Sequence, residues 1–326
     1  MRTVETVRRD RGRRGGTLEE ISRGDAAAEL SVQRRRMSPS GFRRRRTNGK
    51  IVVGLAIIAV LVFAALLEPW IVRFWVGNHS PTSIGVFPMF ALPSAAHPLG
   101  TDRYGQDTLA MVLVALRNSL GVGALSGAVG TVIGVAVGFL AGFLGGWIDH
   151  VLRTMTDAWL VIPTFPILAT LAAFVRVVTL TELALILAAF SWPFAARSIR
   201  AQVLTLRQRP YVELARLSGE GTLQIIFTEI LPNMLPYLGV GFAGSVVGSI
   251  GALVGLAIIG VGAANAISLG TLLSDGMGWG VLSLGLPQIL IVPALVLIAL
   301  FVALNLVNFG LEETYNPRLQ GAGVER

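Results

Sequence analysis

Residues that could carry covalent chemistry or bind a metal are scarce in this sequence. It contains no cysteine and three histidines, His79, His97 and His150, which form no short-range pair such as H-x-x-x-H. Lys50 is the only lysine and Ile51 follows it, so the phosphate-binding pattern G-x-x-x-x-G-K-[ST] of an ATPase is absent. Paired carboxylates and nucleophile motifs are absent as well. These absences predict a chain that is not an enzyme and holds no cofactor or metal of its own.

One short segment does gather groups that could bind a metal or a substrate. His97, Asp102 and Asp107 lie within eleven positions of one another. The Gly-Thr-Asp and Gly-x-Asp pieces around them are also typical of turns, because Asp and Thr side chains accept hydrogen bonds from nearby backbone N–H groups. We favour the structural interpretation of these residues over a binding site.

The composition indicates a membrane protein. The 326 residues are 53% hydrophobic and only 14% charged, whereas a soluble domain of this length carries about a quarter charged residues. Lipid therefore solvates much of the surface. The excess of arginine, alanine, glycine and valine indicates a bacterial source with a GC-rich genome.

The positive charge is concentrated at the N-terminus. Residues 1–50 hold fourteen arginines and Lys50 against six acidic residues, while the rest of the chain is nearly neutral. The segment is too polar to fold alone. We interpret it as a disordered cytoplasmic extension that fixes topology; the alternative is a tail that binds anionic lipid or nucleic acid.

Apolar runs long enough to cross a bilayer predict an all-α protein with six transmembrane helices. They lie at 51–71, 119–144, 160–178, 180–196, 235–262 and 287–309, and the fourth is the shortest. Pro163 and Pro166 should bend or delay the third.

The distribution of Lys and Arg predicts the orientation. With both termini in the cytoplasm, the inside segments hold 23 of the 27 basic residues. The longest outside connection is then 72–118, and the longest inside loop is 197–234. The predicted location is the bacterial inner membrane.

Two sets of glycines recur along single helix faces, and smooth faces of this kind let helix backbones approach closely in lipid. Either a sliding or pore-lining surface or static helix packing would explain them, and we favour packing. The sets are Gly130, Gly134, Gly138 and Gly142, and Gly244, Gly248, Gly251 and Gly255.

Ionisable groups are nearly absent from the predicted span centres, where an ion-coupled transporter would need them. Glu68, Arg176 and Glu182 lie near span ends, where we expect them to reach the interface. The membrane-embedded part therefore resembles a passive pathway whose energy source lies in another protein.

The inside loop predicts two short helices on the cytoplasmic side. Residues 211–218 have helical composition and Gly219 ends them. A second apolar-periodic stretch, 223–230, runs up to Leu231-Pro232. A short amphipathic helix in this position suits a soluble partner.

This loop resembles the EAA loop of ATP-binding-cassette importer permeases, whose pattern is E-A-A, three residues, G, nine residues and I-x-L-P. Leu214 and Glu229 depart from the pattern. In the family, the loop forms a coupling helix that docks into a groove on the ATPase subunit, and the resemblance implies that role for residues around 211–225. The implied site residues are Glu213, Ala215, Arg216, Gly219, Leu231 and Pro232.

Further segments resemble the dipeptide, oligopeptide and nickel group of these permeases, closest to its second, C-type subunit. They are 97–107 (H-x-L-G-T-D), 117–120 (R-x-S-L), 145–157 and 305–318. The positions that differ from the group are Gln106, Ala115, Asn308, Phe309 and Asn316. The last three put the role of the family's acidic pair near the C-terminus in doubt.

The resemblance implies a type I importer core and a division of the chain into four parts: a basic tail (1–50), a first helix with an extracytoplasmic loop (51–118), a permease core (119–312) and a C-terminal tail (313–326). The implied partners are a homologous second permease, two ATPase subunits that bind ATP and Mg, and an extracytoplasmic binding lipoprotein. The implied substrate is a di- or oligopeptide, with nickel or another small solute as the alternative.

Two other classes of protein remain as rivals. One is an ion-coupled secondary transporter, and the other is a membrane-anchored protein that binds lipid or nucleic acid through its tail. The sequence names no residues that bind the transported substrate.

Overall fold

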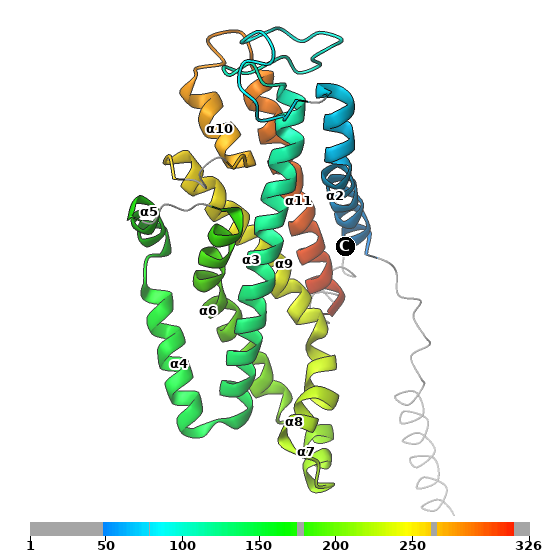
Figure 1. Ribbon diagram of the computed structural model, residues 1–326. Coiled ribbons are helices and arrows are strands. Elements are labelled where there is room, and N and C mark those ends of the chain that lie inside the picture. The colour runs from blue at the N-terminus through cyan, green and yellow to red at the C-terminus, as the bar shows by residue number, and fades with distance from the viewer. Residues whose placement is uncertain (1–47, 78, 175–178, 262–265, 316–326) are drawn as a thin grey trace, which may run out of the picture. The chain divides into compact units, whose positions relative to one another are not determined.

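The computed structural model describes residues 48–77, 79–174, 179–261 and 266–315, and its described part contains helices and connections without a β-strand (Figure 1). The predicted all-α class is confirmed for these residues. Most of the predicted N-terminal tail and residues 316–326 of the C-terminal tail lie outside them. The helices are α2 (Gly49–Val76), α3 (Thr108–Leu144), α4 (Gly146–Val161), α5 (Thr164–Phe174), α6 (Leu180–Leu206), α7 (Pro210–Leu217), α8 (Thr222–Ile225), the π-helix η1 (Ile226–Ile230), α9 (Leu231–Ile258), α10 (Leu269–Gly278) and α11 (Gln288–Tyr315).

Five helical stretches in the described residues are long and apolar enough to cross a membrane: α2, α3, α6, the continuous run Thr222–Ile258, and α11. They coincide with five of the six predicted runs, although their ends differ. Helix α3 begins at Thr108 rather than 119, and α6 continues to Leu206 rather than 196. Apolar runs mark only the lipid-embedded part of a helix, whereas polar residues extend the same helix beyond it.

The sixth predicted run, 160–178, is not confirmed as a single span. Helix α4 ends at Val161, Ile162 takes an extended conformation with ψ of 121°, and α5 starts at Thr164. The residue before a proline is pushed out of the helical region, so Pro163 accounts for the break. The expected bend or delay at this proline is therefore confirmed.

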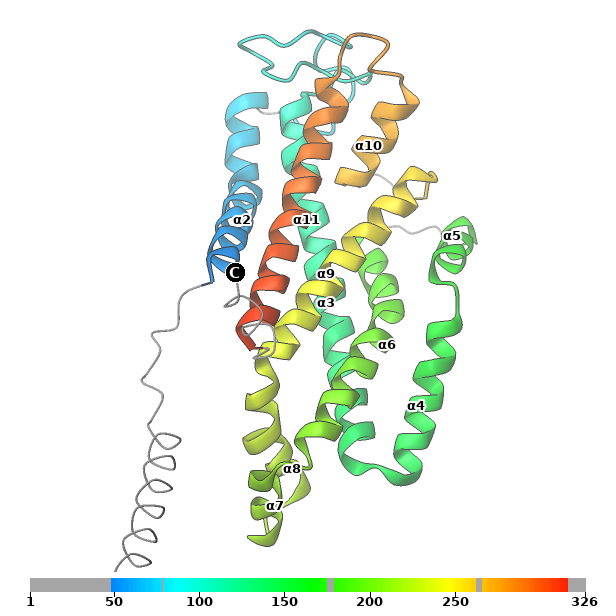
Figure 2. The same ribbon diagram turned by 180° about the vertical axis from the view of Figure 1, so that it is seen from behind.

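Helices α3 and α6 form the most extensive helix pair and run in the same direction. A Cβ added to Gly130 would meet Ser191, one on Gly134 would meet Ala195, and one on Gly142 would meet Val203, so contacts advance along both helices together. Because α3 and α6 are parallel, α4 and α5 must return the chain between them. Figures 1 and 2 show α4 rising beside this pair.

The two glycine sets differ in their environment. The α3 set packs closely against α6, which supports the packing interpretation. In the α9 set, added Cβ atoms on Gly248 and Gly251 would meet nothing within 4 Å. That part of α9 is smooth and uncovered in the described chain.

Helices α2 and α11 lie side by side, with the start of α2 next to the end of α11 (Figure 2). An added Cβ on Gly54 would meet the Ala303 carbonyl oxygen at 2.7 Å, so α2 and α11 are in close contact. Asn48 donates to the Gly310 carbonyl at 3.2 Å, and Lys50 pairs with Glu313 at 3.0 Å. The start of α2 and the end of α11 are therefore on the same side.

The sequence predicted that Glu68 lies near the end of its helix, but the structure places it eight residues before the end of α2. Helix α2 continues to Val76, Glu68 is only 6% exposed, and Arg117 on α3 donates to its carboxylate at 2.9 Å. Glu68 is therefore buried between α2 and α3 in an ion pair rather than extended away from the bundle. Glu182 does lie at a helix end, where it forms a capping box with Thr179, and Arg176 is outside the described residues.

Candidate functional site

The predicted loop helix is present and ends where the sequence indicates. Helix α7 spans Pro210–Leu217, and Gly219 has a φ of +83°. The Glu220 N–H donates to the Ala215 carbonyl and the Gly219 N–H donates to the Arg216 carbonyl. These are the two bonds of a Schellman motif, which favours glycine at the left-handed position.

One face of α7 is anchored in the helix bundle. Val212 is fully buried and Ala215 is 7% exposed. They belong to a core cluster that also contains Phe143 of α3, Val203 of α6 and Ile230 of η1. The predicted site residue Ala215 is thus a packing residue, and the loop helix is held by three other helices.

The opposite side of the loop exposes large apolar side chains. We define the apolar loop face as Leu214, Leu217, Leu223 and Phe227, which are 66%, 82%, 68% and 62% exposed. An isolated exposed leucine is ordinary, but four on one short loop indicate a surface that another protein covers. Leu214, which departs from the family pattern, is part of this face.

Charged groups flank the loop helix. Glu213 is exposed in the first turn of α7, where its negative charge interacts favourably with the helix dipole and stabilises the helix. The Arg216 guanidinium lies over the Phe143 ring, 5.2 Å from its centroid. Arg207, which no sequence pattern marked, donates to the Gly142 carbonyl at 3.0 Å and so satisfies a free carbonyl at the end of α3.

The second loop helix does not stop at Leu231-Pro232 but continues into α9. The π-turn of η1 precedes the proline, and the Leu231 N–H bonds to the Ile226 carbonyl. Proline has no N–H and clashes with the carbonyl four residues earlier, so a local π-turn accommodates it without ending the helix. Leu231 packs against the core cluster, and Pro232 is exposed.

Glu220 adds a polar feature beside the apolar loop face. Its Oε2 atom is buried and makes no hydrogen bond with any residue that the structure describes. A buried carboxylate oxygen without a donor is costly.

A cavity of about 890 Å³ lies among α3, α6, α9 and α11. Two atoms at its wall, Thr131 Oγ1 and Asn308 Oδ1, are buried without a hydrogen-bond partner in the described chain. Its polar lining residues are Thr131, Ser198, Gln202, Tyr237, Asn308 and Glu312. Mostly neutral hydrogen-bonding groups of this kind suit a polar guest with several donors and acceptors. Sequence reasoning missed this site, because its residues come from four separated helices.

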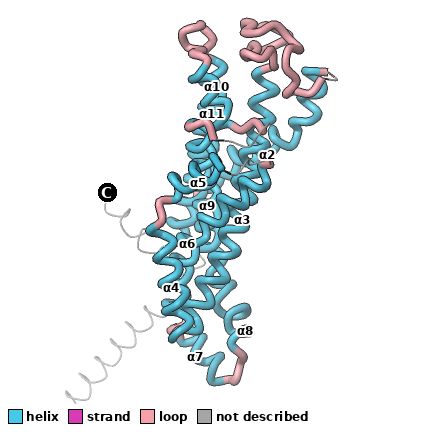
Figure 3. The backbone as a smooth tube through the Cα atoms, turned by 60° about the vertical axis from the view of Figure 1, so that its left-hand side comes forward, coloured by secondary structure: helices cyan, strands magenta, loops and turns pink. Residues whose placement is uncertain are grey.

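The long connection between α2 and α3 lies at the end opposite to the α7–α8 turn (Figure 3). His97 Nδ1 bonds to Asp107 Oδ2 at 2.8 Å, and the Tyr104 and Gln106 N–H groups donate to Asp102 Oδ1. Burial raises the pKa of the Asp102 carboxyl, and Asp275 nearby adds to the rise. No group of three potential metal ligands occurs in the described residues, and the turn interpretation is supported.

Replacing Asp107 by alanine should lower stability. Asp107 is 1% exposed, and its side chain caps α3 by accepting from the Ala110 N–H at 2.9 Å. Loss of such a cap costs about 0.5–2 kcal/mol. We expect a lower unfolding temperature for Asp107→Ala, measured on the purified detergent-solubilised complex. Asp107→Asn retains an acceptor for the cap and should lie closer to the wild type; equal melting of all three proteins would contradict the role.

A bundle of apolar helices with an anchored loop helix at one end, and with a cavity whose apolar wall carries several hydrogen-bonding side chains, has the features of a membrane transport subunit. The family described as "Binding-protein-dependent transport system inner membrane component" matches residues 134–321. Oligopeptide transport system permease proteins OppC of Mycobacterium bovis and Mycobacterium tuberculosis are 30% identical over 277 residues, 84% of this chain and 92% of theirs.

A Brucella abortus permease named for peptide transport is 30% identical over 282 residues, 86% of this chain and 92% of its own. A chain of the MetNI methionine ABC transporter, solved in inward-facing conformations, has a TM-score of 0.48 at 21% identity, covering 62% of this chain and 97% of that one. The protein belongs to the family of inner-membrane components of binding-protein-dependent transport systems, and is an ABC importer permease. The predicted class, an ABC importer permease, is confirmed. It replaces the two alternatives, an ion-coupled secondary transporter and a membrane-anchored protein that acts through its tail.

Proposed function

We propose that this permease imports di- or oligopeptides through the cavity among α3, α6, α9 and α11. The names of its relatives support this substrate class. The cavity supports it too, since hydroxyl and amide groups on its wall match the alternating donors and acceptors of a peptide backbone. Nickel is less well matched, because the lining that the structure describes contains no imidazole and its one soft ligand, Met234, is fully buried.

The loop carrying Glu213, Ala215, Arg216, Gly219, Leu231 and Pro232 is the coupling element in this proposal. The observation that carries it is the apolar loop face, presented on a helix whose other side is buried in the bundle. An exposed helix face on a rigid base suits a groove on a soluble partner. In an ABC importer that partner is an ATPase subunit.

Coupling requires that the ATPase present different contacts to the loop in its two states, because a partner indifferent to the state shifts no equilibrium. Helix α7 packs against α3, α6 and η1 through one cluster. Movement of α7 therefore displaces the helices that line the cavity. On this basis, closure of the ATPases drives the cavity from inward-open to outward-open.

The proposed topology has six crossings and both termini in the cytoplasm. Five single helices would place the start of α2 and the end of α11 on opposite sides, yet these ends lie together. Helices α4 and α5 make the sixth crossing, broken at Pro163. The excess of basic residues in the inside segments sets the direction in a bacterial inner membrane.

The chain supplies half of the pathway and one coupling loop. A homologous second permease supplies the other half, two ATPase subunits bind ATP and Mg, and an extracytoplasmic binding lipoprotein delivers substrate. The permease itself holds no ATPase site or cofactor, in keeping with a single lysine that lacks the phosphate-loop context.

The test is uptake of a labelled tripeptide by proteoliposomes containing the complete importer with its binding protein. We expect uptake that requires ATP and falls several-fold in Asn308→Leu, which removes a cavity hydrogen-bonding group. Asn305→Leu is the matched control, because its amide bonds to the Phe301 carbonyl one turn along its own helix. Uptake driven by an ion gradient without ATP would overturn the proposal.

A further inference from the structure

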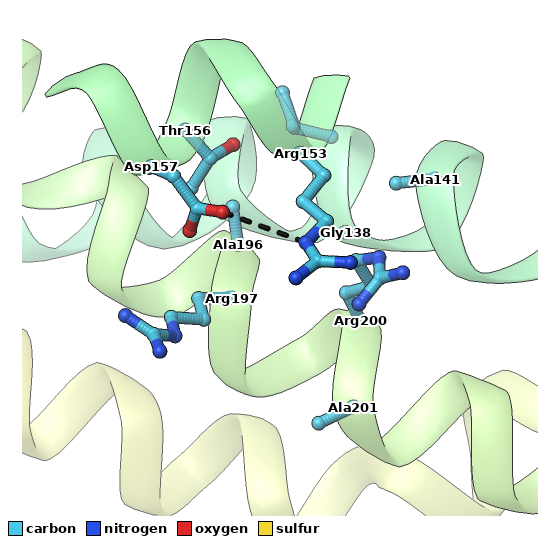
Figure 4. Close-up of a pocket in the computed structure, with 10 residues that line it drawn as sticks. Gly138, Ala141, Arg153, Thr156, Asp157, Ala196, Arg197, Arg200 and Ala201 are labelled. Carbon is cyan, nitrogen blue, oxygen red and sulfur yellow. Dashed lines mark ion pairs between the residues drawn. The ribbon is translucent and has the colours of Figure 1, made fainter. Parts of the chain in front are cut away.

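A second cavity, of about 250 Å³, lies among α3, α4 and α6 and is separate from the proposed pathway. Small residues of α3 and α6 close one side of it, including Gly138, Ala141 and Ala196. Charged side chains surround the rest, and Figure 4 shows Arg153, Asp157, Arg197 and Arg200 around the same opening. Residues 145–157 match the family pattern, but the coupling loop and the pathway leave them unexplained.

Positive charge exceeds negative charge at this cavity. Three arginines line it against one carboxylate, Asp157. Arg200 is held by Asp149, with its Nε and Nη2 atoms 2.5 and 2.7 Å from the two carboxylate oxygens. Counting Asp149 as well, the cavity and its neighbours carry a net charge of one positive unit.

Hydrogen-bond donors are in excess as well. Arg153 Nε is 3.5 Å from Asp157, a long ion pair that leaves most of the Arg153 N–H groups available. Arg197 makes no ion pair or side-chain hydrogen bond with the described residues. A guanidinium carries five donors in a planar fork that suits phosphate oxygens. The cavity is therefore complementary to a phosphate group.

The cavity lies one to two turns from the ends of α3 and α6. Gly138 lies six residues before the end of α3, and Arg200 lies six residues before the end of α6. At 1.5 Å per residue, both are about 9 Å from the helix ends. Long arginine side chains near the ends of membrane helices extend toward the interface, where lipid headgroups lie. The ends of α3 and α6 nearest the cavity point toward the part of the bundle that carries α7, the proposed cytoplasmic side (Figure 1).

Helix α4 is amphipathic, with its charged side toward the cavity and an exposed apolar side opposite to it. Trp147, Val151 and Met155 are 77%, 39% and 52% exposed, whereas Asp149, Arg153 and Asp157 lie on its polar side. Tryptophan is enriched at the membrane interface. The exposed Trp147 therefore indicates that the start of α4 lies at the membrane interface, where lipid headgroups are available.

We propose that the cavity among α3, α4 and α6 binds a phosphate group, supplied by an anionic phospholipid of the surrounding leaflet. Such a lipid joins α4 to α6 beside the Asp149–Arg200 ion pair. The lipid thereby stiffens the side of the bundle against which the coupling loop moves. Basic pockets between transmembrane helices on the cytoplasmic side bind acidic headgroups in this manner.

The test is a titration of the complete, delipidated importer in neutral detergent with dioctanoyl phosphatidylglycerol, followed by the unfolding temperature. A ligand that binds only the folded state raises this temperature with concentration and so yields an affinity. Arg197→Gln should weaken the affinity about tenfold, since it removes a charge-assisted contact. Arg197→Lys should retain most of it. Arg103→Gln, an exposed arginine in the opposite loop, should leave it unchanged.

The variants separate lipid binding from folding and from binding elsewhere on the chain. Arg197 has no partner among the described residues, so Arg197→Gln should melt like the wild type without lipid, which separates binding from folding. Equal affinity of Arg197→Gln and Arg103→Gln for phosphatidylglycerol would overturn the proposal and place binding elsewhere, such as the basic tail. Binding of inorganic phosphate as tight as that of the lipid, and lost in Arg197→Gln, would keep the phosphate site but reject a lipid as its source.

Discussion

Leu217→Asp should abolish recovery of the ATPase subunits with the permease while leaving the permease folded. Leu217 is 82% exposed, so few contacts within the chain are lost on substitution. At the proposed interface, an aspartate would have to be buried without a partner, which is expensive. A central interface residue is worth about 2 kcal/mol or more, which corresponds to at least roughly thirtyfold weaker binding. Co-purification on a tagged permease, with the subunits quantified, measures the effect.

Leu92→Asp is the matched control for this prediction. Leu92 is 69% exposed in the connection at the other end of the helices, so it tests the same chemical change away from the loop. It should leave ATPase recovery unchanged. If both variants retained their ATPases, the apolar loop face would not be the coupling surface. If both lost them, the effect would be on folding.

The sequence predicted the helix and the glycine turn of the inside loop well because their signals are local. A helix of eight residues, a glycine that must adopt a positive φ and a proline at a fixed distance are all encoded within some twenty positions. The burial of Val212 and Ala215 was not predicted, since their neighbours Phe143 and Val203 lie on distant segments. For the same reason, nothing in the sequence pointed to Arg207 as the residue that caps α3.

For the membrane helices too, features encoded within one segment were predicted and contacts between distant segments were not. Five of the six predicted hydrophobic runs coincide with long apolar helices, since lipid demands about twenty apolar residues whatever the tertiary structure. The run at 160–178 failed as a single helix, because Pro163 interrupts it and the amphipathic helix α4 forms part of the return of the chain. The Glu68–Arg117 ion pair was also missed, because pairing between α2 and α3 depends on their relative rotation. No single segment of the sequence determines how side chains from different helices pair within a bundle.

The α3 glycines give the second large prediction, and Gly134→Leu should prevent stable folding. Even a Cβ at this position would lie 2.5 Å from the Ala195 Cβ and 3.0 Å from the Trp192 carbonyl oxygen. Because backbone atoms of α6 cannot move aside as a flexible side chain can, the two helices must separate. Overpacking of this kind costs about 1–3 kcal/mol and occasionally more, and we expect the upper end of that range or beyond.

Gly121→Leu, on the same helix, is the control, because a Cβ there would meet nothing within 4 Å. It should fold at least as well as the wild type, since leucine favours a helix over glycine by up to about 1 kcal/mol. Yield and unfolding temperature of the detergent-purified complex measure both variants. If Gly134→Leu melted like Gly121→Leu, the contact between α3 and α6 would be loose enough to slide, and the α3 glycines would have to be interpreted as a moving surface. A loss confined to Gly134→Leu means that α3 and α6 move as one rigid pair, so that any motion transmitted from α7 must displace α9 against them.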